Sequence, residues 1–210
     1  MSRDHVLHKV RTALGRNAGQ PPSEVPAPRL CIPEVDAETR VRQFLGAVEA
    51  LAGTTLRAAS PEEARAYTAA LIEGKTAVAS NAPLLREWGI ASLPGVRTGV
   101  YDREELRSLC ATANIGITSA DYALADTGTL VMLSSREEAR LISLLPPAHV
   151  ALVAKERLLS GLDELFTILP DPAEKTSSMV LITGPSRTAD IEQILIRGVH
   201  GPGELHVVVV

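Results

Sequence analysis

The stretch GITSADYALADTGTLV, residues 116–131, decides the fold because it carries two apolar segments on either side of a polar turn. Residues 115–118 and 129–133 are short and continuously apolar, which is typical of strands buried on both faces. Comparable runs occur at residues 54–59, 76–80, 96–100, 149–154, 179–183 and 205–210. Because strands of this kind occur mainly in parallel sheets covered by helices, we expect an α/β, three-layer arrangement with a mostly parallel sheet.

Helical segments alternate with these strands. Residues 34–53 place Val41, Phe44 and Val48 at helical spacing. Ser60-Pro61 is a helix-start signal, so a helix is expected from there to residue 73. Further helices are predicted at residues 81–88, 102–111, 155–159 and 188–196. Strand–helix alternation along most of the chain supports the same fold class.

The chain divides into three parts by composition. Residues 1–19 contain an amphipathic helix over 2–14, and residues 20–33 form a linker with prolines at 21, 22, 26, 28 and 33. Residues 34–210 form the α/β domain. The N-terminal helix either docks on the domain, on a second copy or on another protein, or is a loosely tethered end.

Composition and charge exclude several classes of protein. The 210 residues carry a net charge of −4 without a basic run, and only 3% are aromatic, so nucleic acid is not expected as a partner. No stretch is long and apolar enough to span a bilayer. Cys31 and Cys110 are far apart and lack cluster or zinc spacing. We therefore expect a cytoplasmic protein with no metal or cofactor in this chain.

The first polar segment surrounds two predicted chain reversals. A strand is expected to end near Thr118, and Thr118 or Ser119 is expected to cap a short helix with Asp121 in its first turn. Asp126, Thr127 and Gly128 form a tight turn into the next strand. This crowding of hydroxyls and carboxylates fits a site that positions a hydroxylated or phosphorylated substrate, but spacing alone favours ordinary caps and turns.

The second polar segment, residues 183–192, follows a predicted strand. Gly184 makes a turn, and a helix is expected to start at Ser186 or Thr188. Free N–H groups at a helix start bind anions, and Arg187 adds a forked donor for a carboxylate or phosphate. Asp190 complicates this interpretation because it already places negative charge near that helix start.

The third polar segment, residues 198–206, holds three glycines and a proline within six residues. His200 is the strongest general acid/base candidate, with Glu204 as a second. A histidine satisfied by hydrogen bonds in a loop is the alternative interpretation. In open α/β sheets ligands bind beyond the carboxyl ends of strands, and we expect all three segments there.

The runs GITSADYALADTGTLV, LISLLPPAHVALV, GPSRTADIE and GVHGPGELHV, in this order, resemble the lactate utilization protein C family, whose shared module is the LUD domain. The resemblance covers residues 41–210. It implies a Rossmann-like fold similar to sugar-phosphate isomerases, CoA transferases and 5-formyltetrahydrofolate cyclo-ligases. It also implies a role as one subunit of a three-protein system that oxidises L-lactate to pyruvate, with iron–sulfur clusters in the partner proteins.

The sequence thus predicts a pocket for a small carboxylate or phosphate, and it leaves three functions open. These are a subunit of a lactate-oxidising complex, an independent enzyme acting on a phosphorylated or CoA-like ligand, and a non-catalytic assembly or regulatory subunit. Association with a second copy is also left open. Candidate catalytic residues are Asp121, His200 and Glu204. Candidate ligand-binding residues are Thr118, Asp126, Thr127, Gly128, Gly184, Ser186, Arg187, Thr188 and Asp190.

Overall fold

The computed structural model describes residues 2–17, 19–21, 31–188 and 196–210. The chain divides into two compact units, Met1–Leu30 and Cys31–Val210. In the first unit, helix α1 (Arg3–Ala13) begins after Ser2, whose hydroxyl accepts the His5 N–H. A helix is expected here from the sequence. Most of the predicted linker, residues 22–30, lies outside the described residues.

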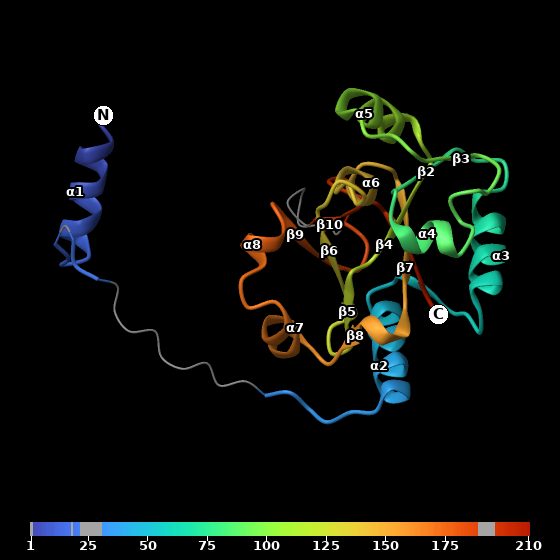
Figure 1. Ribbon diagram of the computed structural model, residues 1–210, viewed down its shortest axis with the longest axis horizontal. Coiled ribbons are helices and arrows are strands. Elements are labelled where there is room, and N and C mark those ends of the chain that lie inside the picture. Colours follow the sequence, from blue (N-terminus) through green and yellow to red (C-terminus); the bar gives the residue numbers. More distant parts are fainter. Residues whose placement is uncertain (1, 18, 22–30, 189–195) are drawn as a thin grey trace. The chain divides into compact units, whose positions relative to one another are not determined.

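The second unit is built on a six-stranded sheet in which every neighbouring pair of strands is parallel (Figure 1). The strand order is β1-β12-β7-β4-β2-β3. The strands are β1 (Thr54–Arg57), β2 (Ala77–Ala79), β3 (Val96–Arg97), β4 (Ile115–Ser119), β7 (Ala148–Val153) and β12 (Glu204–Val209). The α/β fold with a mostly parallel sheet, predicted from the apolar runs, is therefore confirmed.

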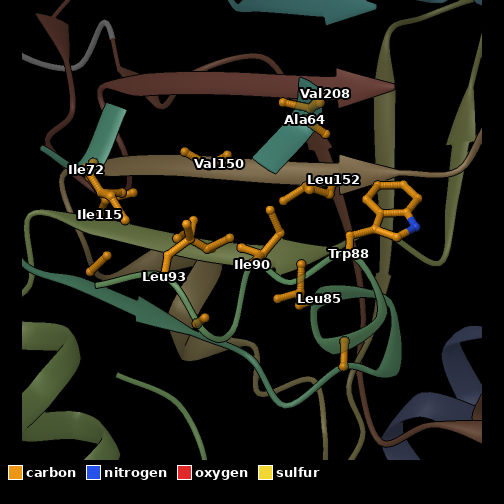
Figure 2. Packing of buried hydrophobic residues seen from close by; sticks show 14 of the residues in the cluster. Ala64, Ile72, Leu85, Trp88, Ile90, Leu93, Ile115, Val150, Leu152 and Val208 are labelled. Atoms are coloured by element: carbon orange, nitrogen blue, oxygen red, sulfur yellow. The ribbon is translucent and has the colours of Figure 1, made fainter. Parts of the chain in front are cut away.

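One face of this sheet is covered by α3 (Pro61–Ile72) and by α4 (Pro83–Glu87) with the loop that follows it. Figure 2 shows Leu85, Trp88 and Ile90 packed against Val150 and Leu152 of β7. Burial of these aliphatic side chains is the main stabilising contribution on this face. The start of α3 follows the sequence signal, because the Ser60 hydroxyl accepts the N–H of the third helical residue.

The opposite face packs against α2 (Ala37–Ala50) and a second, four-stranded sheet (Figure 1). Phe44 of α2 lies in a cluster with Leu130 of the second sheet and Val207 of β12. On the same face, α6 (Leu141–Leu144) lies directly on β4, next to α5 (Arg103–Thr112). This close approach requires Gly116, because a Cβ there would lie 1.9 Å from the Ile142 carbonyl oxygen.

The second sheet overturns two local predictions. Its order is β8-β5-β6-β9, with β5 (Tyr122–Leu124), β6 (Thr129–Leu133), β8 (Leu158–Leu159) and β9 (Met179–Thr183). The helix predicted to be capped by Thr118 or Ser119 is wrong, because the chain enters β5 and pairs antiparallel with β6. The helix predicted at 155–159 is also wrong. Only one 3-10 turn forms (Lys155–Arg157). The chain then enters β8, whose side chains are buried and whose backbone pairs with β5.

Two short helices that the sequence analysis did not identify complete this part of the unit: α7 (Leu162–Ile168) and α8 (Pro172–Lys175). Leu165 of α7 is fully buried and packs against Leu124 and Val131 of the second sheet. The second sheet is thus covered by α7 on the side away from the parallel sheet. Among the described residues, no helix is long and apolar enough to cross a membrane.

The predicted helix at 188–196 is wrong at both of its ends. Strands β10 (Arg187–Thr188) and β11 (Ile196–Arg197) pair antiparallel, and residues 189–195 lie outside the described residues. The backbone of Ser186 explains the difference. Its N–H donates to the Pro202 carbonyl. Its carbonyl accepts the Gly198 N–H and not an N–H of a following helical turn, so the glycine-rich loop takes the place of a helix as its partner.

Candidate functional site

A cavity of about 300 Å³ brings together four residues predicted from the sequence, namely Gly184, Ser186, Arg187 and His200. We call it the Arg187 cavity. It lies at the amino ends of β7 and β12, beside the carboxyl end of β9 and against α6; its lining also includes Ser143, His149, Thr183, Gly201 and Leu205. The second polar segment therefore lies beyond the carboxyl end of a strand, as expected. That strand is β9 of the second sheet and does not belong to the parallel sheet. The volume suits a very small ligand.

Backbone contacts fix the two segments that form the rim of the cavity. Gly184 has φ +78°, and a Cβ there would lie 2.9 Å from the Leu51 Cβ, so the turn after β9 requires glycine. The loop at 198–203 is joined to Ser186 on one side, and on the other its Gly203 N–H donates to the Pro147 carbonyl at 2.9 Å. These bonds hold the segments that carry Arg187 and His200 against the same cavity.

The charges around this cavity favour an anion. Arg187 is exposed, and it has no ion-pair partner among the described residues. His200 is also exposed, and the described lining residues include no Asp or Glu. A guanidinium group can hold a carboxylate or phosphate through two parallel hydrogen bonds. Asp190, which the sequence analysis weighed against anion binding, lies outside the described residues.

His149 is a residue of this cavity that the sequence analysis did not select. It is almost fully buried, and its Nε2 lies 2.7 Å from the Thr118 Oγ1, which connects the first polar segment to the cavity. Burial lowers the pKa of His149 to about 3, so the ring is neutral at physiological pH. Its Nδ1 has no partner among the described residues. The Pro146-Pro147 pair before it gave no sign that this histidine would be enclosed.

The Asp126-Thr127-Gly128 turn lies outside the Arg187 cavity and packs on α2. Gly128 has φ +65°, and a Cβ there would lie 2.7 Å from the Val48 nitrogen. The Thr127 hydroxyl bonds Asp126 at 3.0 Å and Thr129 at 2.8 Å, and Thr129 bonds Thr183 at 2.8 Å. The turn therefore has a structural role. Of the three threonines whose hydroxyls are linked by these hydrogen bonds, Thr183 is the one that lines the cavity.

Two further predicted residues, Glu204 of the third polar segment and Thr188 of the second, also lie outside the cavity lining. Glu204 is exposed at the start of β12, and Thr188 lies on β10 after Arg187. Neither is brought to the Arg187 cavity by the described structure, and their assigned roles remain predictions.

A second hollow, of about 440 Å³, lies where β2, β4 and β7 of the parallel sheet end. We call it the carboxyl-end cleft. Asp121 lines it, and its Oδ2 accepts the Leu133 N–H at 2.7 Å. Burial raises the pKa of Asp121, while this hydrogen bond and Arg157 lower it. Asp121 is thus separated from the other predicted catalytic residues.

Glu138, which the sequence analysis missed, lies in the same cleft. The residue is 7% exposed, and its Oε2 accepts hydrogen bonds from the Ser80 hydroxyl at 2.8 Å and the Ser119 N–H at 3.3 Å. Burial raises the pKa of Glu138 to about 8, and the nearby Asp121 charge adds to this. The segment SSREEAR reads as an exposed polar loop, so nothing in it indicated a buried acid. Among the described residues, no group of three His, Cys, Asp or Glu is placed to hold a metal ion.

Comparison with known proteins gives one family and one fold. The LUD domain family matches residues 41–210. Proteins named lactate utilization protein C are similar: that of Halalkalibacterium halodurans is 38% identical over 130 residues, covering 58% of this chain and 56% of the relative. The Bacillus subtilis protein of that name is 35% identical over 134 residues, covering 57% and 56%. The chain thus spans about half the length of these relatives in the matched regions.

A solved structure supports the fold. The crystal structure of a DUF162 family protein from Deinococcus radiodurans superposes with a TM-score of 0.64 at 17% identity. It covers 83% of this chain and 98% of that protein. At this level of identity the similarity concerns the fold alone.

Proposed function

Because this chain belongs to the LUD domain family, we propose that it acts in lactate utilization, as one subunit of a multi-protein system that oxidises L-lactate to pyruvate. The name shared by its curated relatives supports the role in lactate utilization. The observation that carries the more specific proposal is the Arg187 cavity. A histidine and a guanidinium with no ion-pair partner among the described residues line it, and no described acidic residue does.

In this proposal the cavity binds the substrate by its carboxylate. Arg187 holds the two carboxylate oxygens in a forked contact. His200, which lines the same cavity, accepts the proton of the lactate hydroxyl, and the C–H hydrogen leaves as a hydride for a two-electron acceptor on a partner subunit. The buried, neutral His149 keeps the inner wall uncharged, so the carboxylate is drawn to the Arg187 side.

The electrons are expected to leave the chain. The sequence has no GxGxxG dinucleotide motif, and its two cysteines cannot supply the four thiolates of an ordinary iron–sulfur cluster. We therefore propose that a partner subunit of the same system supplies the hydride acceptor, a cofactor of the flavin class, and that iron–sulfur clusters in the partner proteins then carry the electrons onward one at a time. This division of labour accounts for a chain that has a small-anion cavity and no visible electron carrier motif.

Isothermal titration calorimetry of the full chain with L-lactate and with pyruvate tests the binding step. We expect both to bind, and Arg187→Ala to weaken binding roughly ten- to hundredfold, since a hydrogen-bonded charge contributes about 1.5–3 kcal/mol. Arg197→Ala is the matched control, because Arg197 is an exposed arginine on the paired strand β11 and does not line the cavity.

His200→Gln separates binding from proton transfer. It should bind L-lactate nearly as well as the unsubstituted chain, and should slow pyruvate formation when the chain is combined with its iron–sulfur partners. Absence of any heat with L-lactate and pyruvate at millimolar concentration, or identical binding by the Arg187→Ala and Arg197→Ala variants, would rule out direct substrate binding in this cavity.

A further inference from the structure

The carboxyl-end cleft shares no lining residue with the Arg187 cavity and occupies a different edge of the molecule. It opens where β2, β4 and β7 end: Ser119 is the last residue of β4, Ala154 directly follows β7, and Ala82 lies in the loop after β2. In open parallel sheets this is the edge at which ligands bind, because loops diverge there and leave a crevice. Its volume, about 440 Å³, is within the range of small-molecule sites.

Glu138 provides an independent sign of a ligand in this cleft. Two hydrogen bonds from Ser80 and Ser119 hold its Oε2, while its Oε1 is buried and has no partner among the described residues. A buried polar atom without a partner costs about 1–3 kcal/mol. The carboxyl is therefore oriented on one side and left with an unused hydrogen-bonding atom on the other.

The charges in the cleft restrict the chemistry of that ligand. Asp121, Glu87 and Glu137 line it together with Glu138, and Arg157 is the cationic residue among the described lining. Arg157 also lies 5.7 Å from the centre of the Tyr122 ring, which fixes its position. The acidic majority repels carboxylates and phosphates, whereas carboxylate acceptors next to a guanidinium donor match hydroxyl groups, which both donate and accept.

From this arrangement we propose that the carboxyl-end cleft is a second ligand site, which binds a small hydroxylated molecule without net negative charge, and that Glu138 contacts a ligand oxygen through Oε1. The site is independent of lactate binding at the Arg187 cavity. The two hollows thus select opposite kinds of ligand, an anion in one and an uncharged or cationic polyol in the other.

The proposal has a consequence for pH. Because burial raises the pKa of Glu138 to about 8, its carboxyl carries a proton at neutral pH and donates it in a hydrogen bond. The charged groups that face it are Asp121, Glu87, Glu137 and Arg157. Above about pH 8 the carboxyl loses that proton and with it the hydrogen bond that it donates to the ligand oxygen, so affinity for a ligand held by this bond falls as pH rises through this value.

An NMR titration of the full, isotopically labelled chain tests the site directly. The uncharged probe is erythritol and the cationic probe is D-glucosamine; the anionic probes are L-lactate and inorganic phosphate. We expect erythritol and glucosamine to shift the amide signals of Ser119, Ala120 and Glu138, and the anions to leave them unchanged. Shifts of these amides with the anions and none with the other two probes would overturn the proposal.

Three variants identify the role of Glu138. Glu138→Gln retains an N–H donor and should bind erythritol at neutral pH, with affinity that no longer changes through pH 8. Glu138→Ala should bind at least about fivefold more weakly, as expected for one lost hydrogen bond of about 1 kcal/mol. Glu104→Gln, on the exposed side of α5 and outside the cleft, is the matched control and should leave binding unchanged.

The proposal is wrong if Glu138→Ala keeps a native spectrum and binds erythritol unchanged. The same spectra report the other cavity through the amides of Ser186 and Arg187. A chain that fails to respond to L-lactate there can still respond to erythritol in the cleft, so the two hypotheses fail separately.

Discussion

Replacement of the buried Glu138 by Gln should make the protein more stable at alkaline pH and alter its stability little near pH 5. Glu138 is held by Ser80 and Ser119, and the amide of Gln can keep a hydrogen bond from either donor. What the substitution removes is the proton equilibrium. In the folded protein the pKa of Glu138 is raised by burial from 4.5 to about 8.

The direction follows from proton binding in the two states. Between pH 4.5 and about 8 the folded protein holds a proton on Glu138 that the unfolded chain has lost. Stability from this group is therefore greatest below pH 4.5 and declines as pH rises through the interval. Each pH unit corresponds to 1.36 kcal/mol, so the full interval of about 3.5 units gives an upper value of roughly 5 kcal/mol. Between pH 5 and pH 8 we expect about 3–4 kcal/mol.

Urea denaturation of both proteins at half-unit steps from pH 5 to pH 9 measures this difference. The quantity of interest is the free energy of unfolding of the variant minus that of the unsubstituted chain, because contributions from other titrating groups largely cancel. Glu137→Gln, at the neighbouring and more exposed position, is the control and should give a difference that does not change with pH. A constant difference for Glu138→Gln across the range would refute the assignment of a buried, protonated carboxyl.

Three further predictions concern packing and thiol chemistry. Gly116→Ala should lower the free energy of unfolding in urea by about 3 kcal/mol or more, because its Cβ would lie 1.9 Å from a backbone oxygen of α6. Gly46→Ala in helix α2 is the control and should raise that free energy by about 0.5–1 kcal/mol, because nothing lies within 4 Å of its Cβ. Equal effects of the two substitutions would contradict the close contact at Gly116. Gly128→Ala should lose about 1–3 kcal/mol because its φ is +65° and α2 leaves no room, seen as a lower thermal midpoint. In the native protein the exposed Cys31 should react at once with a chromogenic disulfide reagent. Cys110 should react only after unfolding, because burial raises its pKa to about 11. Two rapidly reacting thiols would count against the packing of α5.

The parallel sheet could be predicted from the sequence because its central strands β2, β4 and β7 are buried on both faces and appear as largely apolar runs. The second sheet was harder to foresee. Its β5 strand is three residues long, and Asp121 before it looks like an acid in the first turn of a helix. In the structure that acid instead accepts the Leu133 N–H of the neighbouring strand, a partner twelve residues away that local spacing cannot reveal.

The candidate site was foreseen in the same uneven way. Arg187 and His200 could be selected because their residue types and glycine-rich surroundings indicate anion binding, and the structure brings both to one cavity. His149 and Glu138 could not, since their importance comes from enclosure by distant segments. Burial of a polar group depends on tertiary packing. When the segments that enclose the group are distant in sequence, no local pattern indicates that it is buried.

The position of β12 between β1 and β7 has a consequence for how the chain folds during synthesis. Thr54 of β1 pairs with His206, so the first strand of the sheet gains its neighbour only after the residues of β12 have been made. Contacts this distant in sequence slow folding, because loop closure precedes the stabilising pairing. Until Glu204–Val209 have emerged from the ribosome, β1 and β7 each present an unpaired edge, which favours aggregation and chaperone binding.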